Sequence, residues 1–76
     1  MMKHYSVRFT IIHNRGTTTA TALSRSVRRA FNKASEKAWD NYETSGATNY
    51  ADEWVTIFRP DGSFLAQGWN SDFSNR

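Results

Sequence analysis

The chain has 76 residues, a formal net charge of +3 and no cysteine. This length predicts one small domain, residues 1–76, and the composition excludes a multi-domain enzyme, a disulfide framework and a thiolate metal site. His4 and His13 are too few for a histidine-built zinc site, so neither a metal nor a cofactor is expected. No apolar run approaches the roughly 20 residues that span a bilayer, and the start of the chain lacks a secretory signal, so we expect a cytoplasmic protein that does not enter a membrane.

Aromatic side chains replace much of the usual aliphatic core. Leu, Ile, Val and Phe make up 13 of the 76 residues, about 17%, where fewer than roughly 20% is a warning of disorder. Eleven residues are Phe, Trp or Tyr, and each ring buries about 150–250 Å². These are more rings than one helix and a small sheet require, so the surplus is expected either to complete the core or to form a contact surface.

The first 20 residues predict a β-hairpin. Apolar and polar residues alternate from Tyr5 to His13, which is typical of a strand with one buried face. Asn14-Arg15-Gly16 has the composition of a turn, and the β-branched residues 17–20 suit a returning strand. We therefore expect a hairpin over residues 4–20.

From Thr21 the apolar spacing changes to three and four residues, which predicts a helix. Thr21 and Ser24 are both candidate N-caps, and Thr21 is preferred because it keeps Leu23 within the apolar stripe. The helix should end near Glu43, where Gly46 offers a glycine C-cap. The stripe comprises Leu23, Val27, Ala30, Phe31, Ala34 and Ala38.

A second hairpin follows a polar connection over residues 44–52. Strands at 53–58 and 64–69 flank a turn at 59–63, whose Pro-Asp-Gly sequence favours a bulged hairpin. Pairing through this turn sets Phe58 opposite Phe64 and Ile57 opposite Leu65. Residues after 69 form a polar tail that contains Phe73. The order predicts an α+β fold: an antiparallel sheet of about four strands (ββαββ) with one helix packed on one face.

The sequence offers few groups for catalysis. His4 and His13 differ by an odd number of positions, so a regular strand points them to opposite faces. Asp52 and Glu53 are adjacent and likewise point apart, which makes them a poor acid–base pair. No phosphate-binding loop, dinucleotide fingerprint or nucleophile elbow is present. The sequence predicts that the protein is not an enzyme.

Basic residues recur along the predicted helix. Arg25, Arg29, Lys33 and Lys37 stand four residues apart, with Arg28 beside them. Like charges at this spacing repel by roughly 0.2–0.5 kcal/mol per pair, so helix stability does not explain the arrangement. We interpret the row as a docking surface for an anionic partner. The alternative is a solvated face, partly neutralised by Glu36 and Asp40.

The second hairpin carries apolar side chains on both faces. Either Val55, Ile57 and Leu65 meet the helix while Trp54, Phe58 and Phe64 face away, or the reverse. Exposed rings could stack on bases, bind a protein or form a homodimer seam. Alternatively, Phe73 with the tail, or the connection at 44–52, covers them.

The layout of these elements resembles that of small phage-encoded inhibitors, particularly anti-CRISPR proteins of type I systems. The resemblance rests on the strand Tyr5-Ser6-Val7-Arg8-Phe9, on the helix that opens at Thr21-Ala22-Leu23-Ser24 and continues into Arg28-Arg29-Ala30, and on the closing hairpin around Pro60-Asp61-Gly62. These inhibitors share no diagnostic motif. The resemblance implies a protein that occludes a surface of a nuclease or guide-RNA complex in the cytoplasm of the host cell.

The leading hypothesis is therefore a non-catalytic protein-binding module, a phage-type inhibitor whose protein target is a CRISPR effector complex. The alternative is a nucleic-acid-binding protein with weak sequence specificity that uses the basic helix. The chain is expected to be a monomer or a homodimer. The residues predicted to bind the partner are Arg25, Arg28, Arg29, Lys33, Lys37, Trp54, Phe58 and Phe64.

Overall fold

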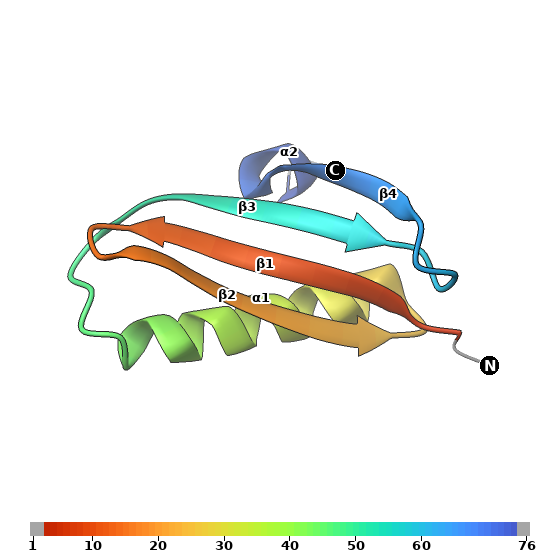
Figure 1. Cartoon of the computed structure of the whole chain (residues 1–76), viewed down its shortest axis with the longest axis horizontal. Coiled ribbons are helices and arrows are strands. Elements are labelled where there is room, and N and C mark those ends of the chain that lie inside the picture. Colours follow the sequence, from red (N-terminus) through yellow and green to blue (C-terminus); the bar gives the residue numbers. More distant parts are fainter. Residues whose placement is uncertain (1–2, 75–76) are drawn as a thin grey trace.

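A four-stranded antiparallel sheet with strand order β2-β1-β3-β4 forms the centre of the computed structural model, which describes residues 3–74 (Figure 1). The elements in chain order are β1 (Tyr5–His13), β2 (Gly16–Ser24), α1 (Val27–Glu43), β3 (Tyr50–Phe58), β4 (Phe64–Trp69) and the short helix α2 (Asn70–Ser74). The predicted α+β class, strand order along the chain and helix on one face are confirmed. The helix α2 was not predicted.

The central strand β1 pairs with both β2 and β3, and its alternating pattern defines the two faces of the sheet. Phe9 lies opposite Ala20 on β2 and Val55 on β3. Val7, Phe9 and Ile11 are fully buried on the face that meets α1, which we call the inner face. The other face, called the outer face here, carries Ser6, Arg8, Thr10 and Ile12 of β1.

A stripe of alanines brings α1 onto the inner face. Ala30, Ala34 and Ala38 are fully buried, and their small side chains let the helix lie close to β1 and β2. One position further around the helix, the Phe31 ring meets Phe9 edge-on, with 5.8 Å between the ring centroids. The helix therefore covers the half of the inner face that β1 and β2 form.

The short helix α2 covers part of the other half of the inner face. Its Phe73 lies 6.3 Å from Phe31, between ring centroids, and belongs to the shell around the core. The α2 helix lies close to Gly68 of β4, where a Cβ would be 3.3 Å from Asp72 Oδ2 and in ordinary contact, 3.5 Å, with Cε2 of Phe73. Phe73 thus packs on the same side of the sheet as α1.

The expected helix start is wrong, because residues 21–24 belong to β2. The register pairs Thr21 with Arg8 and Leu23 with Ser6, so both side chains lie on the outer face. The N-cap is Ser26, in extended conformation, and its hydroxyl oxygen accepts a hydrogen bond from the Arg29 amide at 3.3 Å. Pairing with β1 over nine residues outweighs the helical spacing of Leu23.

The connection after α1 is shorter than expected, because β3 begins at Tyr50. The side chain of Asn14 in the first hairpin turn fastens this connection: its amide nitrogen donates to Thr48 Oγ1 at 3.1 Å, and its oxygen accepts from the Thr48 amide at 3.2 Å. Tyr50 packs edge-on against Trp39, with ring centroids 5.0 Å apart, and against Tyr42 at 6.3 Å. Contacts between rings therefore help to hold the C-terminal end of α1 on the sheet.

Replacing the N-cap tests the observed start of α1. We expect Ser26→Ala to lower the free energy of unfolding by about 1 kcal/mol, because the Arg29 amide loses its acceptor. Thr21→Val keeps a β-branched residue in β2 and removes only the hydroxyl, so it should change stability by less than about 0.5 kcal/mol. Chemical denaturation of both variants measures the difference. A larger loss in Thr21→Val than in Ser26→Ala would contradict the observed helix start.

Candidate functional site

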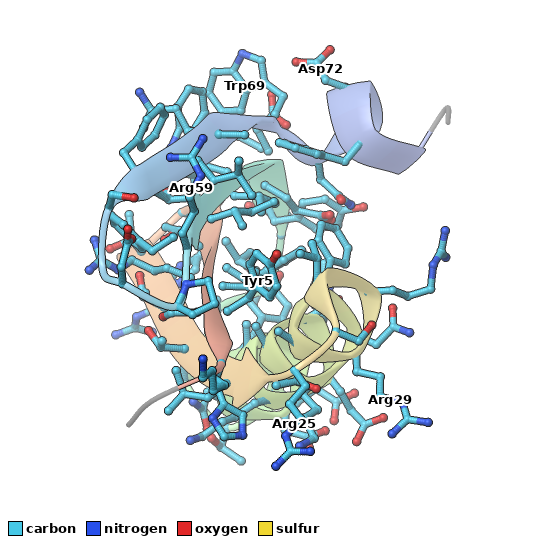
Figure 2. The ribbon with its side chains drawn as sticks, turned by 90° about the vertical axis from the view of Figure 1, so that its right-hand side faces the viewer. Tyr5, Arg25, Arg29, Arg59, Trp69 and Asp72 are labelled. Carbon is cyan, nitrogen blue, oxygen red and sulfur yellow. The ribbon has the colours of Figure 1, made fainter. Side chains whose placement is uncertain are left out.

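The outer face of the sheet carries large apolar side chains that no helix of the described chain covers. Figure 2 shows α1 and α2 on the same side of the sheet, with the outer face open on the other side. Four rings of the second hairpin form what we call the aromatic patch: Trp54, Phe58, Phe64 and Trp69. Phe64 is 51% exposed and Trp69 40% exposed, so these rings are in contact with solvent.

Trp54 and Trp69 form one end of the aromatic patch. They are direct partners across β3 and β4, and their rings meet edge-on with centroids 4.8 Å apart. Their neighbour Thr56 points to the same face, between Arg8 of β1 and Gln67 of β4, and is only 9% exposed. Each indole is thus held by its cross-strand partner, as is typical of aromatic pairs in sheets.

Phe58 and Phe64 form the other end of the patch. They are paired as predicted, but a bulge inserts Leu65, so Ile57 lies opposite Ala66 and not opposite Leu65. Leu65 is 36% exposed and does not reach the core. The guanidinium of Arg8 lies over the Phe58 ring at 5.6 Å from its centroid, a cation–π contact that ties β1 to the patch.

Hydrogen bonds within the turn at 59–63 fix the position of Phe64. The Arg59 guanidinium donates to the Phe64 carbonyl at 2.6 Å, and the Ser63 hydroxyl and amide donate to Asp61 Oδ1 at 2.6 and 2.9 Å. The hydrogen bond from the Ser63 hydroxyl is the main cause that lowers the pKa of Asp61 below its ordinary value of 3.8. Gly62 supplies the positive φ, +90°, that the turn requires.

The predicted basic residues lie away from the aromatic patch. Arg29, Lys33 and Lys37 are exposed on α1, and Arg25 is exposed in the bend before the helix instead of on it. Figure 2 places Arg25 and Arg29 at the opposite end of the view from Trp69. Arg28 is exposed on α1 as well. The structure therefore gives two separate candidate surfaces and does not bring the predicted site residues together.

His13 is the one imidazole that contacts a hydroxyl among the described residues. Its Nε2 lies 2.7 Å from Thr18 Oγ1, and its Nδ1 accepts a hydrogen bond from the Arg15 amide at 3.1 Å. Because Nδ1 is an acceptor, the neutral ring carries its proton on Nε2 and donates it to Thr18. His13 consequently cannot serve as a base for Thr18 in this arrangement. Both contacts order the turn between β1 and β2.

Three residues of the outer surface were not among the predicted site residues: Arg8, Leu65 and Trp69. Unbroken pairing from Phe58 and Phe64 would set Trp69 opposite Glu53, on the other face, and only the bulge sets it opposite Trp54. Arg8 had the parity of the outer face, but its contact with Phe58 depends on the pairing of β1 with β3. The exposure of Leu65 depends on the bulge. The turn sequence favours a bulged hairpin but does not show which residue is bulged.

No protein-family model, curated protein or solved structure matches the chain. Residues 3–74 contain no group of three or more His, Asp or Glu side chains placed to hold a metal ion. No helix among these residues is long and apolar enough to cross a membrane.

The Asp61 carboxylate makes the stability of the second hairpin depend on pH. Its lowered pKa means that the contribution is present above about pH 4 and is lost as the pH falls through the folded-state pKa. We expect the Tm of the wild type to exceed that of Asp61→Asn at neutral pH, and the gap to close as the pH falls through the lowered pKa of Asp61. Thermal unfolding over this range measures it, with Asp40→Asn as the control. A gap that stays constant would contradict the role of the carboxylate.

Proposed function

We propose that the protein is a non-catalytic protein-binding module and that the aromatic patch is its main contact surface. The observation that carries the proposal is an uncovered sheet face with two paired tryptophans and two further rings. Tryptophan is enriched among the residues that dominate binding energy in protein interfaces. The strands hold these rings in fixed positions, so a partner meets a surface that is already ordered.

The charges around the aromatic patch favour a protein over a nucleic acid as its partner. A surface that binds single strands combines stacking rings with a positively charged groove for the backbone. Here the cations nearest the patch are already engaged: Arg8 lies on Phe58, and Arg59 donates to the Phe64 carbonyl. The exposed residues Arg29, Lys33 and Lys37 lie on α1, on the other side of the sheet. Direct nucleic-acid binding, the alternative function, would have to rely on the basic side chains alone.

We infer further that the module acts as an inhibitor of the phage type in the host cytoplasm, by occluding a surface of a CRISPR effector complex. The layout of the strands and of α1 supports this part of the proposal. The mechanism requires no reaction: the patch docks on the effector and blocks a site by its bulk. A chain of 8.7 kDa is large enough to cover an interface of about 800 Å² per partner.

Binding to a purified type I effector complex tests the proposal. We expect Phe64→Ser with Trp69→Ser to weaken binding by at least roughly thirtyfold, because two exposed anchors are lost. Tyr50→Ser is the matched control: Tyr50 is 53% exposed, close to the 51% of Phe64, but it belongs to the cluster with Trp39 and Tyr42. This control should bind nearly as well as the wild type.

The same samples separate binding from inhibition. Target DNA binding by the effector should fall when the wild-type protein is added and recover with the double variant. Circular dichroism of each variant establishes that the fold is intact. Equal binding of the double variant and the wild type would refute the patch as the contact surface, and absence of any effector binding would refute the inhibitor assignment.

A further inference from the structure

The strand β2 forms an edge of the sheet that lacks the usual protection. It is nine residues long, Gly-Thr-Thr-Thr-Ala-Thr-Ala-Leu-Ser, with no charged residue and no proline, and its register with β1 is unbroken. Natural edge strands are normally short, bulged, charged or covered, because their free backbone groups pair readily with other chains. The opposite edge follows this rule: β4 has six residues, contains the Leu65 bulge and runs into α2.

The basic side chains of α1 lie on the flank of the helix nearest this edge. Arg29, Lys33 and Lys37 each precede a buried alanine by one position, whereas Phe31 and Trp39 each follow one. Successive residues advance about 100° around a helix, so the two sets lie on opposite flanks of the alanine stripe.

Ring contacts fix which flank faces which strand. Phe31 meets Phe73 of α2, which packs on β3 and β4, and Trp39 meets Tyr50 of β3. The opposite flank therefore faces β2. Figure 2 shows Arg25 and Arg29 at the end of the view opposite α2 and Trp69. We call Arg25, Arg29, Lys33 and Lys37 together the basic row.

The basic row has no ionic partner within the described part of the chain. All four side chains are exposed, and none forms a salt bridge within 4.0 Å to a carboxylate of residues 3–74. Glu36 and Asp40 follow Lys33 and Lys37 at a spacing of three residues but do not pair with them. The free backbone groups of β2 can form hydrogen bonds with another strand, and the four unpaired cations beside them can bind carboxylates.

We propose that the β2 edge is a strand-addition site for an acidic, extended segment of a partner protein. The segment extends the sheet by pairing its backbone with β2, and its carboxylates on the inner side face the basic row. Alternate residues of a strand are about 6.6–6.8 Å apart, and residues four apart on a helix rise about 6 Å. An acidic residue at every second position thus comes close to the spacing of Arg29, Lys33 and Lys37 on α1, which crosses β2 at an angle (Figure 1).

A second copy of the chain fits this edge poorly. Pairing of β2 with itself about a two-fold axis places both α1 helices on the same side of the extended sheet. The two basic rows would then face each other, and like charges repel. The charge complementarity of the site therefore selects an acidic strand. This inference uses different residues from the aromatic patch and does not rest on the proposed function.

A short synthetic peptide tests the site directly. The probe is a nine-residue peptide with capped ends in which Glu alternates with Thr and Val, titrated to millimolar concentration into the ¹⁵N-labelled protein. We expect shifts confined to the amides of β2 and to residues around the basic row. The matched peptide with Lys in place of Glu should produce none. Absence of shifts in β2 with the Glu peptide would overturn the proposal.

Two matched comparisons separate strand addition from simple charge attraction. Lys33→Glu should weaken peptide binding by roughly three- to tenfold, whereas Arg28→Glu changes the net charge equally and should change binding by less than about twofold. Two further Glu peptides carry N-methyl groups on alternate residues, one on the odd and one on the even positions. Only alternate N–H groups of the peptide point to β2, so one of the two peptides loses these donors and should lose binding although it keeps every carboxylate.

The remaining outcomes identify other occupants. If both N-methylated peptides bind as well as the parent peptide, the contact is electrostatic only and strand addition is wrong. Tighter binding of an oligothymidylate to the same residues would assign the row to nucleic acid. Light scattering that gives twice the monomer mass, with β2 amides protected from exchange, would assign the edge to a second copy. Circular dichroism of Lys33→Glu and Arg28→Glu establishes that both variants remain folded.

Discussion

The stripe of three buried alanines on α1 sets the arrangement of the rest of the molecule. Because Ala30, Ala34 and Ala38 face the sheet without bulk, the helix lies close to β1 and β2 and its rotation is fixed. That rotation turns Phe31 and Trp39 toward β3, where they meet other rings. It turns the basic residues toward the open β2 edge. A larger residue in the stripe would force the helix to lift or to rotate, which would disturb both flanks together.

The sheet divides the eleven rings of the chain between three tasks. Those on the inner face, such as Phe9, Phe31 and Phe73, pack with the buried Val, Ile and Ala side chains of the core. A second group around Tyr42 holds the far end of α1. The third group is the aromatic patch, which contributes little to the core because no helix covers that face. The surplus of rings over aliphatic residues is thus partly structural and partly available for contacts.

Local patterns predicted the strands at 5–13 and 64–69, because alternation and turn chemistry act over a few residues. They left open which face of the second hairpin meets the helix. They failed at residues 21–24, where Leu23 satisfies both the helical spacing and the alternation of a strand. Pairing with β1 decides between the two, and that pairing is not a local property. The same limit explains why the displacement of Leu65 from the core by the bulge was not predicted. It also explains why the separation of the basic row from the aromatic patch was not predicted, because this depends on how α1 crosses the sheet.

The positions of the two surfaces restrict how one partner could use both. The β2 edge and the aromatic patch on β3 and β4 are separated by β1 and share no described contact, so their binding free energies should add. A strand added to β2 would lengthen the sheet and widen its outer face. A partner that supplies this strand and also covers the patch must therefore wrap across the outer face. Each contact would then raise the effective concentration of the other, so two weak contacts could hold one partner firmly.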